Sequence, residues 1–176
     1  MTSRILESER LYLRPYTWDD LGELRRLNSD PEVMRYLGGV ESEDATRAML
    51  RDRILAYYDA NPGLGVWATH RKADHAHLGF HLLNQVREGN EIQVGYRLYP
   101  EHWGQGYATE MARALLRYGF EERQLPEIVA MADVGNTASR HVLEKIGLVW
   151  YRQHPYVGLD CHWYRTSREA WLAAAG

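Results

Sequence analysis

Trp103-Gly104-Gln105-Gly106-Tyr107-Ala108 is the stretch that decides the fold, because a strand pattern leads into it and a helix pattern leads out of it. Apolar and polar residues alternate from Ile92 to Leu98, which predicts a strand that ends before Pro100. Apolar residues then recur at helical spacing from Ala108 to Phe120, which predicts an amphipathic helix. A glycine-rich turn between the two leaves backbone N–H groups free at the positive end of the helix dipole. The stretch therefore predicts a phosphate-binding site.

Two common phosphate-binding loops do not match this turn. The nucleoside-triphosphate loop has Lys followed by Ser or Thr after its last glycine, whereas Tyr107 follows Gly106 here. The dinucleotide fingerprint has a third glycine at the position where this chain has Thr109. It also has an acidic residue roughly 20 residues further on, and Asp133 comes too late in the sequence to match it. The turn thus serves another phosphorylated ligand, or it is a tight connection that binds none.

The downstream sequence narrows the choice. Ile128 to Ala132 predicts a buried strand, and Asn136 opens a second amphipathic helix that Gly147 ends. Together with the glycine turn, these elements resemble the acetyl-CoA-binding core of the GNAT superfamily of N-acetyltransferases, in its Rim-type branch that acetylates ribosomal-protein N-termini. The residues that carry the resemblance are Gly95-Tyr96, Pro100, Trp103 to Ala108, Glu110, Asn136, Ser139 and Leu143 to Leu148.

The resemblance implies an α/β (α+β) fold, with a mixed, mostly antiparallel sheet of six to seven strands flanked by helices. We expect residues 1–176 to form one such domain, since 176 residues suffice for a single sizeable core. The local patterns agree with this element order. They also predict a short helix from Asp30-Pro31 and a longer one that Ser42 opens.

The resemblance also implies roles for particular residues. The turn from Trp103 through Gly104, Gln105, Gly106, Tyr107 and Ala108 would hold the pyrophosphate of acetyl-CoA. The backbone near Tyr96 and Leu98 would pair with the pantetheine arm, which the Asn136 side chain would contact. The Ser139 hydroxyl would assist the departing thiolate as a general acid. Both Asn136 and Ser139 have a second interpretation, as residues that cap the helix.

The general base is where this chain departs from the family pattern. Rim-type proteins often carry Glu two residues before the Gly-Tyr pair, and this chain has Gln93, whose amide cannot accept a proton. Glu91 is expected on the same strand face, about 6.6 Å further along. It is the candidate base, directly or through water. It is equally well explained as a solvated residue beside a turn, and an α-amino group of low pKa needs no dedicated base.

Composition excludes several classes of protein. A formal net charge of −3, with basic residues spread along the chain, predicts no nucleic-acid binding. No apolar run is long enough to predict a membrane span. One cysteine, Cys161, suits a cytoplasmic location. The spacing of His75, His77 and His81 does not predict a metal site.

The expected activity is transfer of the acetyl group from acetyl-CoA to a primary amine, by direct attack in a ternary complex. A non-catalytic acyl-CoA-binding regulatory module and a transferase of a larger acyl group, such as succinyl, are alternatives. The acceptor is open, from a peptide N-terminus to a small-molecule amine, and so is the choice between monomer and homodimer. Four aromatic residues are expected to border the acceptor groove, namely Tyr16, Tyr36, Trp67 and Tyr156.

Overall fold

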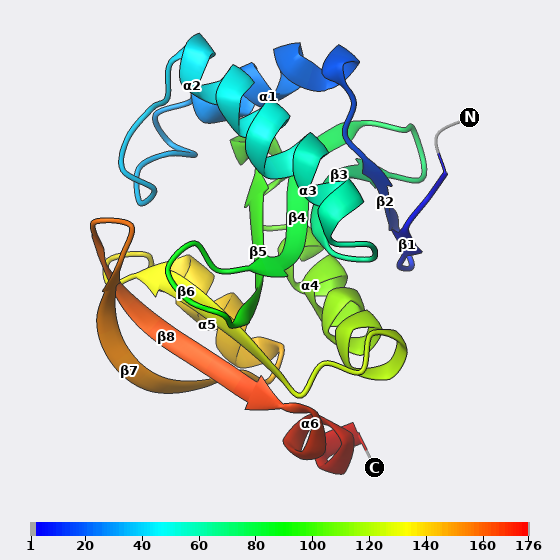
Figure 1. Ribbon diagram of the computed structural model, residues 1–176, viewed down its shortest axis with the longest axis vertical. Coiled ribbons are helices and arrows are strands. Elements are labelled where there is room, and N and C mark those ends of the chain that lie inside the picture. Colours follow the sequence, from blue (N-terminus) through cyan, green and yellow to red (C-terminus); the bar gives the residue numbers. More distant parts are fainter. Residues whose placement is uncertain (1–2, 176) are drawn as a thin grey trace.

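One eight-stranded sheet runs through the computed structural model, which describes residues 3–175 (Figure 1). In sheet order the strands are β1 (Leu6–Glu7), β2 (Leu11–Pro15), β3 (Gly65–Arg71), β4 (His77–Gln85), β5 (Ile92–Leu98), β6 (Glu127–Asp133), β8 (Leu159–Ser167) and β7 (Val149–Tyr156). Every neighbouring pair is antiparallel except β5 and β6. The mixed, mostly antiparallel sheet is confirmed. The number of strands is eight instead of six to seven, because the two-residue strand β1 is too short to show an alternating pattern.

Helices cover both faces of this sheet. On one face lie η1 (Trp18–Asp20), α1 (Leu21–Asn28), α2 (Glu43–Ala48), the π-helical segment η2 (Met49–Leu55) and α3 (Ala56–Ala60). On the other lie α4 (Tyr107–Arg117), which follows η3 (Pro100–His102) and continues into η4 (Tyr118–Glu122), and α5 (Thr137–Lys145) (Figure 1). The C-terminal helix α6 (Arg168–Ala175) packs at the end of β8. None of the helices within residues 3–175 combines the length and apolar character needed to cross a bilayer.

Two apolar cores correspond to the two helical layers. Leu24 and Leu27 of α1 and Leu50 and Ile54 of η2 pack with Phe80 on one face. On the other face, the apolar stripe of α4 packs on side chains of β4, β5 and β6; its fully buried members are Met111, Leu115 and Leu116. The helical periodicity seen in the sequence therefore identifies the face of α4 that the sheet covers.

Ser42 opens a helix as predicted, and a second side-chain cap lies at Thr17. Thr17 caps η1 through a capping box, and the Ser42 side chain accepts a hydrogen bond from the backbone N–H of Ala45. The short helix expected from Asp30-Pro31 is wrong, because residues 31–38 form consecutive turns. Asp30 does accept from the backbone of Glu32, so the local cap forms. The segment before Gly38 is too short for later helical hydrogen bonds to offset the unfavourable free energy of forming the first turn.

A gap between β5 and β6 is the feature that positions the site. These strands pair only at Gln93 and Val129, and beyond that pair they separate toward their carboxyl ends. From Val94 to Leu98, β5 has a strand partner on its β4 side only. Helices α4 and α5 begin shortly after the ends of β5 and β6, so both helix N-termini lie at the open end of the gap.

Candidate active site

The glycine turn at positions 103–108 has the geometry of an anion-binding site (the anion seat). Gly104 and Gly106 have φ of 72° and 81°, in the left-handed region that favours glycine, and Gly106 is the N-cap of α4. The indole Nε1 of Trp103 donates to the carbonyl of Leu98 at 2.9 Å, which closes the turn onto β5. Within residues 3–175, the backbone N–H groups of positions 104–109 have no hydrogen-bond partner. This row of free donors stands at the positive end of an 11-residue helix.

Arg10 and Glu110 fasten the turn to the start of β2. Glu110 accepts three hydrogen bonds, from the Ser8 hydroxyl at 2.7 Å, the Arg10 backbone N–H at 2.8 Å and Arg10 Nε at 2.7 Å. Arg10 Nη2 donates to the Gln105 carbonyl at 3.0 Å, and the guanidinium lies 4.4 Å from the centre of the Tyr107 ring. A positive charge therefore stands beside the anion seat. Sequence reasoning missed Arg10, since no local pattern links it to a helix 100 residues away.

His81 holds the first turn of α4 against the sheet. This buried side chain bonds the Ala108 carbonyl through Nε2 at 3.3 Å and the Thr69 hydroxyl through Nδ1 at 2.8 Å. A carbonyl only accepts, so Nε2 carries the proton and Nδ1 accepts from Thr69. Burial lowers the pKa of His81 from 6.5 to about 4, so the ring is neutral at pH 7.

Tyr96 and Ser139 meet at the open end of the gap. The Tyr96 hydroxyl donates to Ser139 Oγ at 3.3 Å, and burial raises the pKa of Tyr96. The Asn136 side-chain oxygen accepts from the Ser139 backbone N–H at 3.2 Å, so the capping interpretation of Asn136 is confirmed. The Ser139 hydroxyl takes no part in that cap, and it lies between two elements that border the gap.

Gln93 and Glu91 occupy different settings from those expected. Gln93 Nε2 donates to Asn84 Oδ1 at 3.1 Å across the β4–β5 pair, which leaves the Gln93 amide oxygen able to accept. Glu91 precedes β5 instead of belonging to it, since the strand begins at Ile92 and the Glu91 carbonyl accepts from Val86 N at the end of the hairpin. Its carboxylate packs beside Gly89, where an added Cβ would meet Glu91 Oε2.

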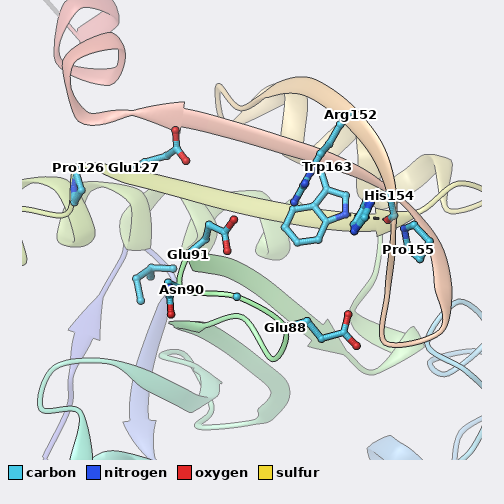
Figure 2. Close-up of a pocket in the computed structure, with 11 residues that line it drawn as sticks. Glu88, Asn90, Glu91, Pro126, Glu127, Arg152, His154, Pro155 and Trp163 are labelled. Atoms are coloured by element: carbon cyan, nitrogen blue, oxygen red, sulfur yellow. Dashed lines mark hydrogen bonds between the residues drawn. The ribbon is translucent and has the colours of Figure 1, made fainter.

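An open pocket of about 780 Å³ lies beside Glu91 (Figure 2). Figure 2 shows Glu88, Asn90 and Glu91 on the wall formed by the hairpin, opposite Arg152, His154 and Trp163. The Arg152 guanidinium lies 4.3 Å from the centre of the Trp163 ring. Glu91 therefore has room for water or a substrate group next to its carboxylate, as a base would need.

Two of the four expected groove aromatics lie elsewhere. Trp67, in β3, and Tyr16, directly after β2, are each 2% exposed and belong to the cores between the sheet and the helices. Tyr36 lies against Gly135, just before α5. The Tyr156 hydroxyl accepts from Arg87 N at 2.9 Å, at the tip of the β7–β8 hairpin.

The histidines and the cysteine offer no other reactive centre. Across the described residues, no three His, Cys, Asp or Glu side chains gather closely enough to hold a metal ion. His77 contacts Tyr16, Tyr99 and Glu23 instead. Burial raises the pKa of the Cys161 thiol to about 11, so it is protonated at neutral pH.

Comparison with known proteins finds one family. The sequence model described as an acetyltransferase (GNAT) domain matches residues 10–149. The chain is 35% identical over 147 residues to the uncharacterized N-acetyltransferase YoaA of Bacillus subtilis (strain 168), with 81% of each protein covered. A solved acetyltransferase from Agrobacterium tumefaciens str. C58 is 27% identical with a TM-score of 0.82, covering 94% of this chain and 95% of that chain. The spermidine N-acetyltransferase from Vibrio cholerae, solved with CoA and spermine, shares the fold at 19% identity, with a TM-score of 0.75 over 93% of this chain and 98% of that chain.

Proposed function

Because this chain belongs to the GNAT acetyltransferase family, we propose that it transfers the acetyl group of acetyl-CoA to a primary amine by direct attack in a ternary complex. The observation that carries this proposal is the row of free N–H groups at positions 104–109, next to the gap between β5 and β6. Those donors suit a pyrophosphate, and the gap offers an unpaired strand edge to a linear arm that carries amide groups. The Vibrio cholerae enzyme was solved with CoA, which agrees with this assignment.

The residues divide between the parts of the donor. Gly104, Gln105, Gly106, Tyr107 and Ala108 hold the pyrophosphate through their backbone, and Trp103 keeps the turn closed. Arg10, beside the turn, adds a positive charge. The free β5 edge at Tyr96 and Leu98 receives the pantetheine arm, and the Asn136 amide N–H₂, which has no partner within residues 3–175, is available to donate to it.

The chemistry requires a nucleophile, a base and a proton donor. The amine nitrogen forms a bond to the thioester carbonyl carbon, and the carbon–sulfur bond breaks with its electron pair leaving on sulfur. The ammonium proton passes to a base, and the thiolate takes a proton or a hydrogen bond. We assign the donor role to Ser139, backed by the Tyr96 hydroxyl. We assign the base role to Glu91 acting through water, with the Gln93 oxygen accepting an N–H from the amine.

Two alternatives were a regulatory module that binds acyl-CoA without activity and a transferase of a larger acyl group. A regulatory module without activity would have no use for the Tyr96–Ser139 pair at the gap, which favours a catalytic protein. A larger acyl donor would use the same seat and gap, so acetyl-CoA and succinyl-CoA must be compared directly. The cytoplasmic location and the homodimer stay predictions.

Acetyl-CoA binding tests the proposal. Acetyl-CoA should raise the Tm of the wild type, whereas NAD and ATP should not. Gly104→Trp should abolish the rise, because a bulky side chain at this left-handed φ of 72° strains the turn that carries the free N–H donors. Gly158→Trp is the matched control, since Gly158 has a similar φ of 79° and equally open surroundings at a distant hairpin. No Tm change with saturating acetyl-CoA in the wild type would contradict the proposed function.

A further inference from the structure

The segment between α1 and α2, residues 29–41, is a closed loop that reaches away from its own helices. Its two ends meet at Asn28, the last residue of α1, whose carbonyl accepts from the Glu41 backbone N–H at 2.9 Å. Val33 and Met34 anchor its middle in the apolar core on the α1 side of the sheet. Figure 1 shows the segment extending from α1 and α2 toward the end of β6 and the β7–β8 hairpin. This 29–41 loop therefore lies near the open end of the gap between β5 and β6.

Asn28 joins the 29–41 loop to β5. The Asn28 side chain is fully buried, and its amide nitrogen donates to Glu41 Oε2 at 3.3 Å and to Thr46 Oγ1 at 3.2 Å. Its amide oxygen accepts from Arg97 Nη1. Both N–H donors and the carbonyl oxygen of the amide are thus in use. Asn28 fixes the base of the loop, the helix α2 and the strand β5 relative to one another.

Arg97 and Asp133 mark the two sides of the gap at one level. In the single β5–β6 pair, Gln93 lies opposite Val129, and Arg97 and Asp133 each come four residues later on these parallel strands. Because side chains alternate along a strand, all four lie on one face of the sheet. That face is opposite α4, since Leu98, the neighbour of Arg97, packs into the core on the α4 side.

Tyr36 carries the 29–41 loop to the β6 side of the gap. Its ring lies against Gly135, where an added Cβ would be 3.2 Å from Tyr36 Cε1 and 3.3 Å from Asp133 Oδ1. Gly135 lies just before α5, the helix that carries Ser139. The base of the loop is thus tied to β5, and its tip rests on the connection that follows β6. The loop spans the open end of the gap on the face opposite α4.

This arrangement restricts the path of the acceptor. The inference rests on the proposed function, in which the donor occupies the α4 side of the gap and the amine arrives from the other face. The Tyr36 ring is partly exposed, so an acceptor passing beneath the loop can contact it. We propose that Tyr36 is a specificity-determining residue that limits the width of the acceptor, and that Asn28 and Arg97 are positioning residues that hold it there. The acceptor class is an amine at the end of a slender chain.

Two amines that differ in width test the role of Tyr36. The amino groups of 3-phenylpropylamine and 3,3-diphenylpropylamine have the same local structure, so the site alone distinguishes them. With saturating acetyl-CoA, kcat/KM should be at least about tenfold higher for 3-phenylpropylamine. Tyr36→Ala should reduce that ratio to about threefold or less by lowering KM for the wide amine, whereas Tyr36→Phe keeps the ring and should keep the ratio. Glu32→Ala, at an exposed position of the same loop, is the control.

Two further variants test the positioning residues. Arg97→Met keeps the apolar stem and removes the hydrogen bond to Asn28, and Asn28→Asp keeps the acceptor for Arg97 but loses the donors to Glu41 and Thr46. Each should lower the ratio toward that of Tyr36→Ala. The Kd of acetyl-CoA should stay within about twofold of the wild type, because the anion seat lies on the other face. Arg97→Lys retains a donor and should keep more of the preference.

The outcomes separate this inference from the proposed function. A wild type that binds acetyl-CoA and acetylates both amines equally well, or neither of them, overturns the inference and leaves the proposed function intact. An unchanged ratio in Tyr36→Ala also overturns it. A lower Tm with an unchanged ratio in Arg97→Met and Asn28→Asp would show a purely structural contact and overturn the positioning role. Acetyl-CoA that fails to bind the wild type overturns the proposed function itself.

Discussion

Two hydroxyl groups, those of Tyr96 and Ser139, form the hydrogen-bonded pair to which we assign protonation of the leaving thiolate. Ser139→Ala should lower kcat by about 10- to 1,000-fold with acetyl-CoA affinity nearly unchanged, because the hydroxyl acts only as sulfur departs. Tyr96→Phe keeps the ring packed against His81 and should lower kcat less, since Ser139 remains. Steady-state kinetics and acetyl-CoA titration measure both effects.

The control for Ser139 lies on the same helix. Thr137→Ala changes an exposed residue in the first turn of α5 and should leave kcat unchanged. The Asn136 cap accepts from the backbone N–H of residue 139, so it survives in Ser139→Ala. If the free energy of unfolding lost in Ser139→Ala equals the activation free energy gained, the hydroxyl stabilises the fold and is not a proton donor.

Glu91 is the other residue whose role can be decided by substitution. If Glu91 accepts the proton, Glu91→Gln should depress kcat/KM at neutral pH and recover partly as rising pH deprotonates the amine. Gln93→Glu should be tolerated, because Asn84 can turn its amide to donate to the new carboxylate. A pH–rate profile of the wild type and both variants measures this. If Glu91→Gln matches the wild type at every pH, the carboxylate is not catalytic and the amine's own titration sets the rate.

What the sequence could predict at single residues depends on how local each signal is. The glycine turn at Gly104 and Gly106 and the Asn136 cap involve neighbouring residues, and the pattern of turn residues was sufficient to predict them. Arg97 meets Asn28 69 residues away, and Arg10 meets Glu110 100 residues away. No spacing rule joins such pairs, so both contacts became visible only in the folded chain.

At the scale of elements, the contact between β2 and α4 can be tested through Glu110. This carboxylate accepts from Ser8 and twice from Arg10, and the hydrogen bonds lower its pKa despite a partial burial that acts in the opposite direction. Glu110→Ala should lower the free energy of unfolding by about 1–3 kcal/mol, the range for losing hydrogen bonds to a charged group. It should also weaken acetyl-CoA binding, because Arg10 then no longer holds the turn carbonyl in place.

Urea unfolding and acetyl-CoA titration check both consequences for Glu110. Glu122→Ala is the control, since Glu122 is exposed and forms no hydrogen bond or ion pair within residues 3–175; its effect should stay within about 0.5 kcal/mol. Unchanged stability in Glu110→Ala would mean that apolar packing alone holds β2 against α4.

Elements with a long periodic pattern were predicted correctly, and those without one were not. The apolar stripe of α4 and the alternation in β5 span several turns or residue pairs, so the family and the fold that they indicate are confirmed. Strand β1 has two residues, and the turns after Asp30 have a cap without a following stripe. Only the family resemblance implied that the backbone of β5 near Tyr96 and Leu98 has no strand partner on one side, because no local pattern records where a ladder stops.

On the scale of the whole molecule, buried neutral histidines tie stability to pH. Burial lowers the pKa of both His77 and His81 from 6.5 to about 4, and for His77 the neighbouring His70 adds to the effect. Their protons would therefore bind the unfolded chain first as pH falls. The unfolded state then holds more protons between about pH 6.5 and pH 4, so the free energy of unfolding falls as pH is lowered through this window.

The expected slope is steep enough to measure. Each histidine that stays neutral when folded and charges when unfolded contributes up to about 1.4 kcal/mol per pH unit. Between pH 5 and pH 6.5 most carboxylates remain ionised, since the ordinary pKa of Asp is 3.8 and that of Glu is 4.5, so the slope there reports the histidines. Urea unfolding followed by tryptophan fluorescence at pH 5, 6 and 7 gives the slope.

His81→Gln should reduce that slope, because it removes one of the groups that titrate only in the unfolded chain. The amide can still donate to the Ala108 carbonyl, so the variant should fold and keep α4 attached to β4. His154→Gln, at an exposed histidine, should leave the slope as in the wild type. If His81→Gln loses stability with pH as steeply as the wild type does, His81 binds protons equally in the folded and unfolded states, and its pKa is not lowered on folding. The assignment of a neutral His81 ring, which holds the glycine turn in place, would then be wrong. A charged ring could not accept a hydrogen bond from Thr69 through Nδ1.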